Sequence, residues 1–393
     1  MTLFEQDSEY LLHTYARRNL AFVSGRGATL REAGGEEYID FTAGIGVASV
    51  GHGNARLAQT LTAQASSVMH TSNLYLIAPQ VALAKKLVEL SGLDARVFFG
   101  NSGAEANEGA IKIARKYGET SGRYEIITLD NSFHGRTIAT LKATGQAKFH
   151  DHFAPFPDGF CYAENLADIY RKITPKTVAV MIELVQGEGG VQAQDKTEVQ
   201  QLAAELKSRD ILLIVDEIQT GVFRTGEFVA STIYGIQPDV ITLAKGLAGG
   251  VPIGAVITTK KEVFSYGDHG STFGGNFLST AAAITTLEIL HEQYASGALA
   301  QTVQHFSRRC AEFAAQHSGL FTGETGLGLM RALKAKNDDI KTQVISQAHN
   351  ERVLVLNSGR SRVRMLPPLT ITVAEIDEGF ARLGKACSGI DAI

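Results

Sequence analysis

The chain has 393 residues, with 37 lysines and arginines against 41 aspartates and glutamates, and a net charge of -4 at pH 7. This length predicts two or three domains with a large core, and the charge lacks the positive excess typical of nucleic-acid-binding proteins. The three cysteines, Cys161, Cys310 and Cys387, are few, widely spaced and odd in number. They argue against a disulfide framework and predict a reducing, cytoplasmic environment.

The beginning of the chain predicts neither secretion nor membrane insertion. Residues 1–20 mix acidic and basic side chains with one apolar pair, Leu11-Leu12, so a signal-peptide core is missing. Apolar stretches such as residues 178–182 have the length of strands and are too short to cross a bilayer. We therefore expect no membrane association.

Strand-like apolar runs alternate with helical patterns through the middle of the chain, which is typical of α/β proteins. The runs lack polar alternation, as strands buried on both faces do, so we predict a mostly parallel sheet flanked by helices. They cover residues 97–99, 125–129, 178–185, 211–215, 240–243 and 253–258.

Three regions follow from this pattern. The sheet belongs to a large domain predicted at residues 53–266. Residues 267–393 contain a helical stretch, 281–294, and then turn signals, which together predict a smaller α+β domain. Residues 1–52 are predicted to join the smaller domain.

A lysine and an aspartate stand at the ends of two predicted strands. Lys245 ends the run 239–244, and Asp216 ends the run 211–215. Ligands of parallel α/β sheets bind beyond the carboxyl ends of the strands. Pyridoxal phosphate needs an amine for its aldehyde and a carboxylate for its ring nitrogen, so the pair favours that cofactor. Singly, such a lysine is more often solvated, and such an aspartate more often caps a helix.

Two further motifs fit the same cofactor. Ser102, Gly103 and Ala104 begin a helix, and their small side chains leave its first amides open to a phosphate. The alternative is an ordinary capping box of Ser102 and Glu105. Phe133 follows the run 125–129 and, with Ile218, offers two apolar faces for a flat ring; by itself Phe133 is more often core.

Seven segments in order along the chain resemble the class III pyridoxal-phosphate-dependent aminotransferases. They are FTAGIGVASVG at 41–51, FFGNSGAEANE at 98–108, FHGRT at 133–137, VQGEGG at 185–190, DEIQTG at 216–221, LAKGLAGG at 243–250 and HGSTFGGN at 269–276. The resemblance implies a fold like that of aspartate aminotransferase and its relatives.

The same resemblance implies roles at the cofactor. Lys245 bonds to its aldehyde, Asp216 pairs with the ring nitrogen, and Gln219 meets the phenolic oxygen. The phosphate lies on the amides after Ser102. Thr272 reaches it from a second subunit, so the active sites are shared within a homodimer. The ring lies between Phe133 and Ile218.

The resemblance also implies four substrate-binding residues. Arg136 holds a carboxylate of the substrate, Ser271 lies near the donor, and Glu188 and Arg364 form a switch. A free Arg364 would bind the α-carboxylate of glutamate or 2-oxoglutarate through parallel hydrogen bonds. Pairing with Glu188 would mask it while a donor presents its distal amine. The simpler interpretation of Arg364 is a surface arginine.

The implied reaction transfers the terminal amine of N2-acetylornithine to 2-oxoglutarate, giving N-acetylglutamate semialdehyde and glutamate, as in arginine biosynthesis. Ornithine, N-succinylornithine, N-succinyl-diaminopimelate or 4-aminobutyrate could replace that donor, and a non-catalytic pyridoxal-phosphate-binding protein is the remote alternative. A dehydrogenase is disfavoured because Gly44-x-Gly46 lacks the third glycine of a dinucleotide fingerprint. No metal is expected, since His150 and His152 have no accompanying ligand cluster.

Overall fold

The computed structural model describes residues 1–390, and its centre is a seven-stranded sheet. Strand β12 is antiparallel to both neighbours, while the pairs from β11 to β6 are parallel, which confirms the mostly parallel sheet. Strand β6 is the one that the sequence did not predict. The spatial order is β4 (Arg96–Gly100), β12 (Gly254–Thr258), β11 (Val240–Leu243), β10 (Leu212–Asp216), β7 (Thr177–Ile182), β5 (Glu125–Leu129) and β6 (Phe160–Ala163).

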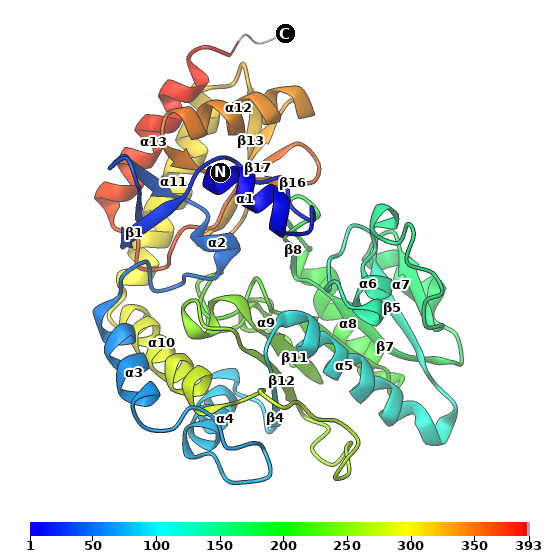
Figure 1. Cartoon of the computed structure of the whole chain (residues 1–393). Coiled ribbons are helices and arrows are strands. Elements are labelled where there is room, and N and C mark those ends of the chain that lie inside the picture. Colours follow the sequence, from blue (N-terminus) through cyan, green and yellow to red (C-terminus); the bar gives the residue numbers. More distant parts are fainter. Residues whose placement is uncertain (391–393) are drawn as a thin grey trace.

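Helices cover both faces of this sheet (Figure 1). Ile127 and Val180 share a hydrophobic cluster with Leu202 of α8, whereas the adjacent Ile126 and Ala179 share another cluster with residues of α5. Successive strand residues thus enter opposite cores, which explains why the strands are apolar throughout. The helices of this region are α5 (Gly103–Gly118), α6 (Ile138–Ala143), α7 (Leu166–Lys172), α8 (Lys196–Ser208) and α9 (Ala230–Tyr234), with the 3-10 turns η1 (Glu119–Ser121), η2 (Ala147–Phe149) and η3 (Lys245–Ala248).

The carboxyl-terminal part forms a second layered unit, at the top of Figure 1. An antiparallel sheet, in the order β13, β14, β17 and β16, packs against α11 and α12, and α13 packs on these two helices. The strands are β13 (Phe321–Leu327), β14 (Met330–Ala335), β16 (Leu356–Ser358) and β17 (Arg362–Met365), and the helices are α11 (Ala298–Gln316), α12 (Asp338–Asn350) and α13 (Val373–Cys387).

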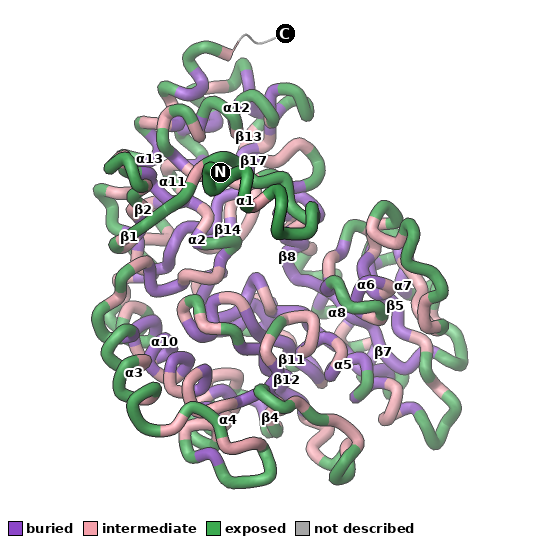
Figure 2. The backbone as a smooth tube through the Cα atoms, in the orientation of Figure 1, coloured by how far each residue is buried: buried purple, intermediate pink, exposed green. Residues whose placement is uncertain are grey.

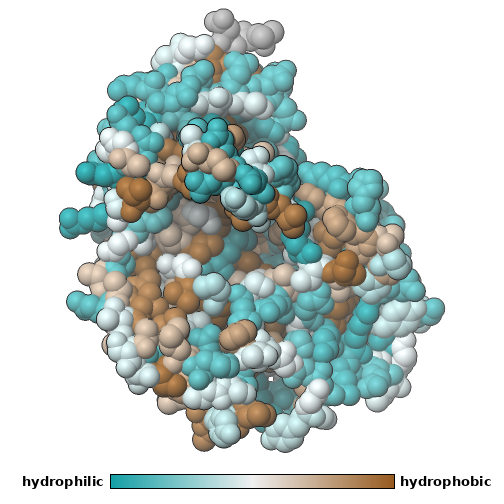
Figure 3. Space-filling model, viewed as in Figure 1, coloured by the Kyte–Doolittle hydropathy of each residue, from teal (hydrophilic) through white to brown (hydrophobic). Residues whose placement is uncertain are grey.

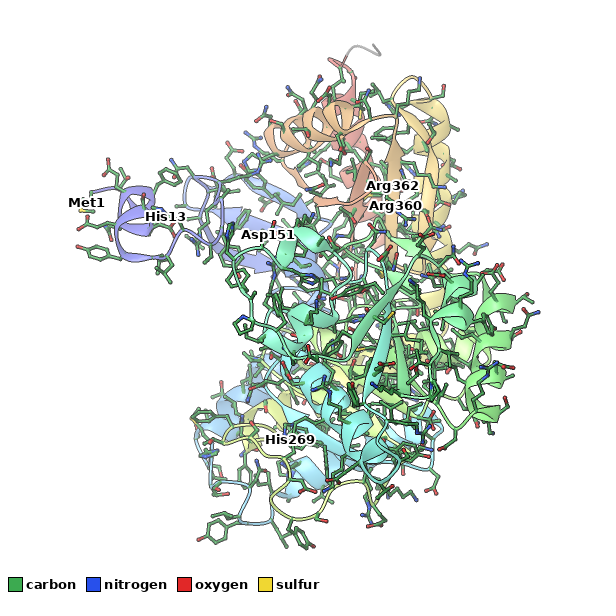
Figure 4. All side chains as sticks on the ribbon, turned by 90° about the vertical axis from the view of Figure 1, so that its right-hand side faces the viewer. Met1, His13, Asp151, His269, Arg360 and Arg362 are labelled. Carbon is green, nitrogen blue, oxygen red and sulfur yellow. The ribbon has the colours of Figure 1, made fainter. Side chains whose placement is uncertain are left out.

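The amino-terminal strands lie beside this unit. Strand β15 pairs parallel with β3, which brings residues more than three hundred positions apart into one small sheet. Helix α1 and the following residues stand away from the body, as the labelled Met1 and His13 show (Figure 4). The elements are α1 (Leu3–Tyr10), β1 (Phe22–Arg26), β2 (Thr29–Glu32), β3 (Glu37–Asp40), α2 (Ala43–Gly46) and β15 (Val353–Leu354).

The remaining elements connect these units. The predicted helix 281–294 lies within α10 (Phe277–Ala295), which packs on α3 (Ala55–Ala65) and α4 (Ala78–Ser91). The short hairpin of β8 (Val185–Gln186) and β9 (Gln192–Ala193) follows β7. Buried residues concentrate in the central sheet and exposed ones on the outer helices and the amino-terminal segment (Figure 2). The domain boundaries drawn from the sequence stay predictions. Within residues 1–390, no helix has the length and hydropathy of a membrane span.

Candidate active site

A cavity of about 380 Å³ opens at the carboxyl ends of β10 and β11. The predicted parallel arrangement puts these ends on one edge of the sheet, so residues distant in sequence meet there. Ten of the predicted site residues line the cavity: Ser102, Gly103, Ala104, Phe133, Arg136, Glu188, Asp216, Ile218, Gln219 and Lys245.

The start of α5 forms one end of the cavity. Ser102 caps the helix by accepting a hydrogen bond from the Glu105 amide at 3.2 Å. The Glu105 side chain turns back to Asn101 rather than to the Ser102 amide, so the capping box is only half formed. The amides of Gly103 and Ala104 take no part in the hydrogen bonds of residues 1–390 outside regular elements. Free amides at a positive helix end suit an anion.

Asp216 is buried at the end of β10 with a fixed orientation. Its Oδ2 accepts hydrogen bonds from Asn107 Nδ2 and from His134 Nδ1, both at 2.8 Å, and Oδ1 accepts one from the Ile218 amide at 3.1 Å. An ionised carboxylate only accepts, so His134 carries its proton on Nδ1 when Asp216 is charged. These contacts fix the orientation of the carboxylate towards the cavity.

Lys245 begins η3 directly after β11 and lines the same cavity. Its φ of 35° lies in the left-handed region, a strained conformation that recurs at functional sites. Burial lowers the pKa of the Lys245 amine, and the nearby Asp216 carboxylate opposes that effect. The neutral amine, which is the nucleophilic form, is therefore more accessible than in a solvated lysine.

Arg136 is an arginine of the cavity wall without an acidic partner in the described part of the chain. Its guanidinium lies 4.1 Å from the centre of the Phe149 ring and 5.5 Å from that of Phe133. The ion pairs near the cavity join His134 to Asp216 and Arg364 to Glu188. Arg136 forms no ion pair with a carboxylate among residues 1–390. The aromatic faces hold the cation while its N–H groups stay free for an anionic ligand.

Arg364 is buried on β17 and is paired. Its Nη1 donates to Glu188 Oε1 at 2.8 Å, to the Gly187 carbonyl at 3.2 Å and to Gln219 Oε1 at 3.3 Å. Its Nε is buried without a partner among residues 1–390. The structure thus contains the masked arrangement of the predicted switch, and it rules out a solvated surface arginine.

Ser271 and Thr272 lie outside the cavity lining of their own chain. Ser271 Oγ accepts hydrogen bonds from Asn101 Nδ2 at 3.1 Å and from the Gly274 amide at 2.9 Å, and Asn101 lines the cavity beside the start of α5. Thr272 is exposed on the loop after it. Its predicted role in a second subunit stays a prediction.

Comparison with known proteins shows the family of this chain. The model of the class III aminotransferases matches residues 13–387. The chain belongs to the class III aminotransferases. Acetylornithine aminotransferase of Wolinella succinogenes is 57% identical over 98% of this chain and 99% of its own, and that of Methanocaldococcus jannaschii is 42% identical over 94% of each chain.

Solved structures agree on the fold of this class III aminotransferase. N-acetylornithine aminotransferase from Stenotrophomonas maltophilia superposes with a TM-score of 0.82 at 32% identity, covering 98% of each chain. Ornithine aminotransferase from Toxoplasma gondii superposes with a TM-score of 0.92 at 30% identity, covering 98% of this chain and 94% of its own. The expected aspartate-aminotransferase-like fold is confirmed.

Four residues of the aminotransferase site were missed or given no role from the sequence. Asn107 and His134 orient Asp216, Phe149 stacks on Arg136, and Glu183 lines the cavity beside Asp216. Three of them had an available signal: Asn107 and His134 lie in two of the segments that resemble the family, and Glu183 follows an apolar strand as Asp216 does. Within residues 1–390, no group of three His, Cys, Asp or Glu side chains is arranged to hold a metal.

Proposed function

We propose that this aminotransferase uses pyridoxal phosphate to move the terminal amino group of N2-acetylornithine to 2-oxoglutarate. The observation that supports it most is the cavity with Lys245 and Asp216 at its base, an unpaired Arg136, and Arg364 neutralised by Glu188. One free arginine suits a donor whose only carboxylate lies far from its reacting amine. The two acetylornithine aminotransferases above support this donor.

The residues present fit the cofactor. The buried Asp216 carboxylate suits a protonated ring nitrogen, and the open amides after Ser102 suit a phosphate. A Cβ on Gly103 would come within 2.8 Å of Ile218 Cδ1, so glycine keeps the helix start close to the ring-covering residue. When bound, pyridoxal phosphate supplies an electron sink for the carbon that loses its proton.

Lys245 and Asp216 have separate tasks in this proposal. Lys245 would hold the cofactor through its aldehyde, and its Nζ would move the proton to and from the reacting carbon, because it lies within the same cavity. Asp216, fixed by Asn107 and His134, holds the ring nitrogen protonated.

Arg136 and Arg364 bind the carboxylates of the two substrates in different combinations. The α-carboxylate of acetylornithine binds Arg136 while Glu188 masks Arg364. With 2-oxoglutarate, Glu188 moves away, Arg364 receives the α-carboxylate and Arg136 the distal one. Phe133 and Ile218 would cover the two faces of the cofactor ring. Gln219, which accepts a hydrogen bond from Arg364, would meet the phenolic oxygen of the cofactor.

Steady-state kinetics test the choice of donor. We expect kcat/KM for N2-acetylornithine to exceed that for free ornithine by at least about tenfold, because the charged α-amine of ornithine would lie in an incompletely solvated cavity. N-succinylornithine and 4-aminobutyrate are the comparison donors. Equal or higher kcat/KM with free ornithine would show that the donor is wrong.

A homodimer completes the proposal. Apolar side chains are exposed on the amino-terminal segment and on the connection between α3 and α4: Met1, Leu3, Leu12, Met69, Leu74, Tyr75 and Leu76. Hydrophobic surface also gathers around α3 and α10 on the face of Figure 3. Exposed apolar surface of this extent is typical of an interface. Thr272 would then enter the neighbouring site, in a cytoplasmic enzyme of arginine biosynthesis.

A further inference from the structure

Glu183 is a buried carboxyl group in the cavity wall that the reaction described above does not use. Its side chain lines the cavity and is 5% exposed. In the sheet, Val215 of β10 pairs with Ile182 of β7, so the next residues, Asp216 and Glu183, end adjacent parallel strands. Two carboxyl groups therefore lie side by side at the base of the cofactor cavity.

Both oxygens of Glu183 accept hydrogen bonds from the backbone. Oε1 accepts from the Phe133 amide at 2.8 Å, and Oε2 accepts from the Gly187 amide at 3.0 Å. The two peptides come from different segments of the chain, one after β5 and one after β8. The carboxylate is thus a bridge across the cavity wall.

Each of these peptides belongs to a residue that shapes the site. The Phe133 ring lines the cavity and lies 5.5 Å from the Arg136 guanidinium. The Gly187 carbonyl accepts hydrogen bonds from Arg364 Nη1 at 3.2 Å and from Ser358 Oγ at 2.8 Å. Glu183 therefore connects Phe133, through its amide, with Arg364 on β17, through the peptide of Gly187.

The electrostatic surroundings make Glu183 sensitive to pH near neutrality. Burial raises the pKa of Glu183 to about 7, His134 opposes the rise, and Asp216 adds to it. Lys245, on η3, is a further charge that interacts with Glu183, while Arg364 and Glu188 pair with each other. Above neutral pH the ionised group accepts both amide hydrogen bonds at full strength, and its protonation weakens them.

We propose that Glu183 is a positioning residue whose ionised carboxylate holds the peptides of Phe133 and Gly187 in place and thereby preorganises the cofactor cavity. The inference rests on the proposed function only in taking this cavity as the pyridoxal phosphate site. Its effect is strongest above neutral pH, where the carboxylate is charged.

Glu217 offers a matched control one residue beyond Asp216. It is also fully buried, and it accepts hydrogen bonds from the Ala230 amide at 2.9 Å, from the Ser231 amide and hydroxyl at 2.8 Å each, and from the Thr220 hydroxyl at 2.6 Å. It does not line the cavity. Glu217→Gln is therefore the control for a buried glutamate that only stabilises the fold.

The first test measures the dissociation constant of pyridoxal phosphate from the apo-protein by equilibrium dialysis. At pH 8.5 we expect Glu183→Gln to bind about tenfold more weakly than wild type, because the amide cannot accept both N–H groups and presents a donor to one of them. At pH 6 the ratio should approach one, because wild-type Glu183 is then mostly protonated. Glu217→Gln should lower the thermal unfolding midpoint and leave the dissociation constant within about twofold.

The second test needs no variant. Hydrogen exchange of the wild-type apo-protein, read from peptides that contain Phe133 and Gly187 and corrected for the intrinsic pH dependence, should show protection rising as pH increases through 7. A peptide containing the Ile126 amide, which donates to the Gly159 carbonyl at 2.8 Å and not to a carboxylate, should not show this rise. This measurement applies even if Glu183→Gln does not fold.

The outcomes separate this inference from the proposed function. If wild type binds no pyridoxal phosphate, the proposed function fails. If wild type binds it and Glu183→Gln has the same dissociation constant at both pH values, or loses affinity equally at both, only the role of Glu183 is overturned. Protection that is flat across pH 7 in the wild-type protein overturns it as well.

Discussion

At the scale of single residues, the site depends on side chains that hold other side chains. Hydrogen bonds from Asn107 and His134 orient Asp216. Arg136 lies against aromatic rings rather than beside a carboxylate. An acidic partner would compete with substrate for the guanidinium, whereas an aromatic face leaves its N–H groups free. The unpaired state of Arg136 is therefore part of its proposed function.

Replacing Phe149 tests this arrangement. Phe149→Leu keeps an apolar side chain but removes the ring 4.1 Å from Arg136. We expect KM for 2-oxoglutarate to rise about threefold to fivefold with little change in kcat, since a cation–π contact of this kind is worth roughly 1 kcal/mol. Phe149→Tyr retains the ring and should behave as wild type. An unchanged KM in the leucine variant would contradict the role of Phe149.

At the scale of elements, the left-handed turn at α2 is held by one carboxylate. Ala43, Gly44 and Ile45 have φ values of 46°, 61° and 66°, and a β-branched residue such as Ile45 is strained there. Asp40 Oδ1 accepts hydrogen bonds from the Thr42 amide at 2.8 Å, the Thr42 hydroxyl at 2.6 Å and the Ala43 amide at 3.0 Å. The turn leads to Val47, which lines the cavity.

Stability against pH tests the role of Asp40. Burial alone would raise its pKa, but the hydrogen bonds from His52 and Thr42 outweigh burial and lower it. The stabilisation is therefore present at neutral pH and is lost as pH falls below about 4. Asp40→Asn should cost about 2 kcal/mol at pH 7, and the difference from wild type should shrink below pH 4.

Thermal or urea unfolding at pH 7, 5 and 3.5 measures this difference. The exposed Asp339→Asn, in the first turn of α12, is the control and should change stability little at any of these pH values. A deficit of Asp40→Asn that stays constant down to pH 3.5 would show that ionisation of Asp40 does not stabilise the turn.

At the scale of the whole molecule, the proposed homodimer places Thr272 in the site of the neighbouring subunit. We expect Lys245→Ala to be inactive, and Thr272→Asp to bind pyridoxal phosphate poorly because its carboxylate repels the phosphate. A heterodimer of the two variants, purified with two tags, contains one site free of both changes and should regain about half of wild-type activity per dimer. A heterodimer as inactive as its parents would rule out sharing through Thr272.

The sequence predicted the central sheet, because strands covered on both faces must be apolar along their whole length. It also placed Lys245 and Asp216 at strand ends and Ser102 at a helix start, since such motifs are local in the chain. Strand β6 (FCYA) was missed because four residues among polar neighbours give too short a signal.

Only the tertiary structure decided how distant segments meet. The contacts of Phe149 with Arg136 and of Glu183 with Phe133 join residues that no local pattern relates, because a side chain's partner depends on packing rather than on spacing along the chain. The family resemblance had implied that Arg364 pairs with Glu188, and the structure contains this contact at 2.8 Å. Thus the sequence by itself determined the strands and the reactive groups, whereas the fold decided which side chains meet, because a contact such as that of Arg364 with Glu188 requires β17 to lie beside the segment that follows β8.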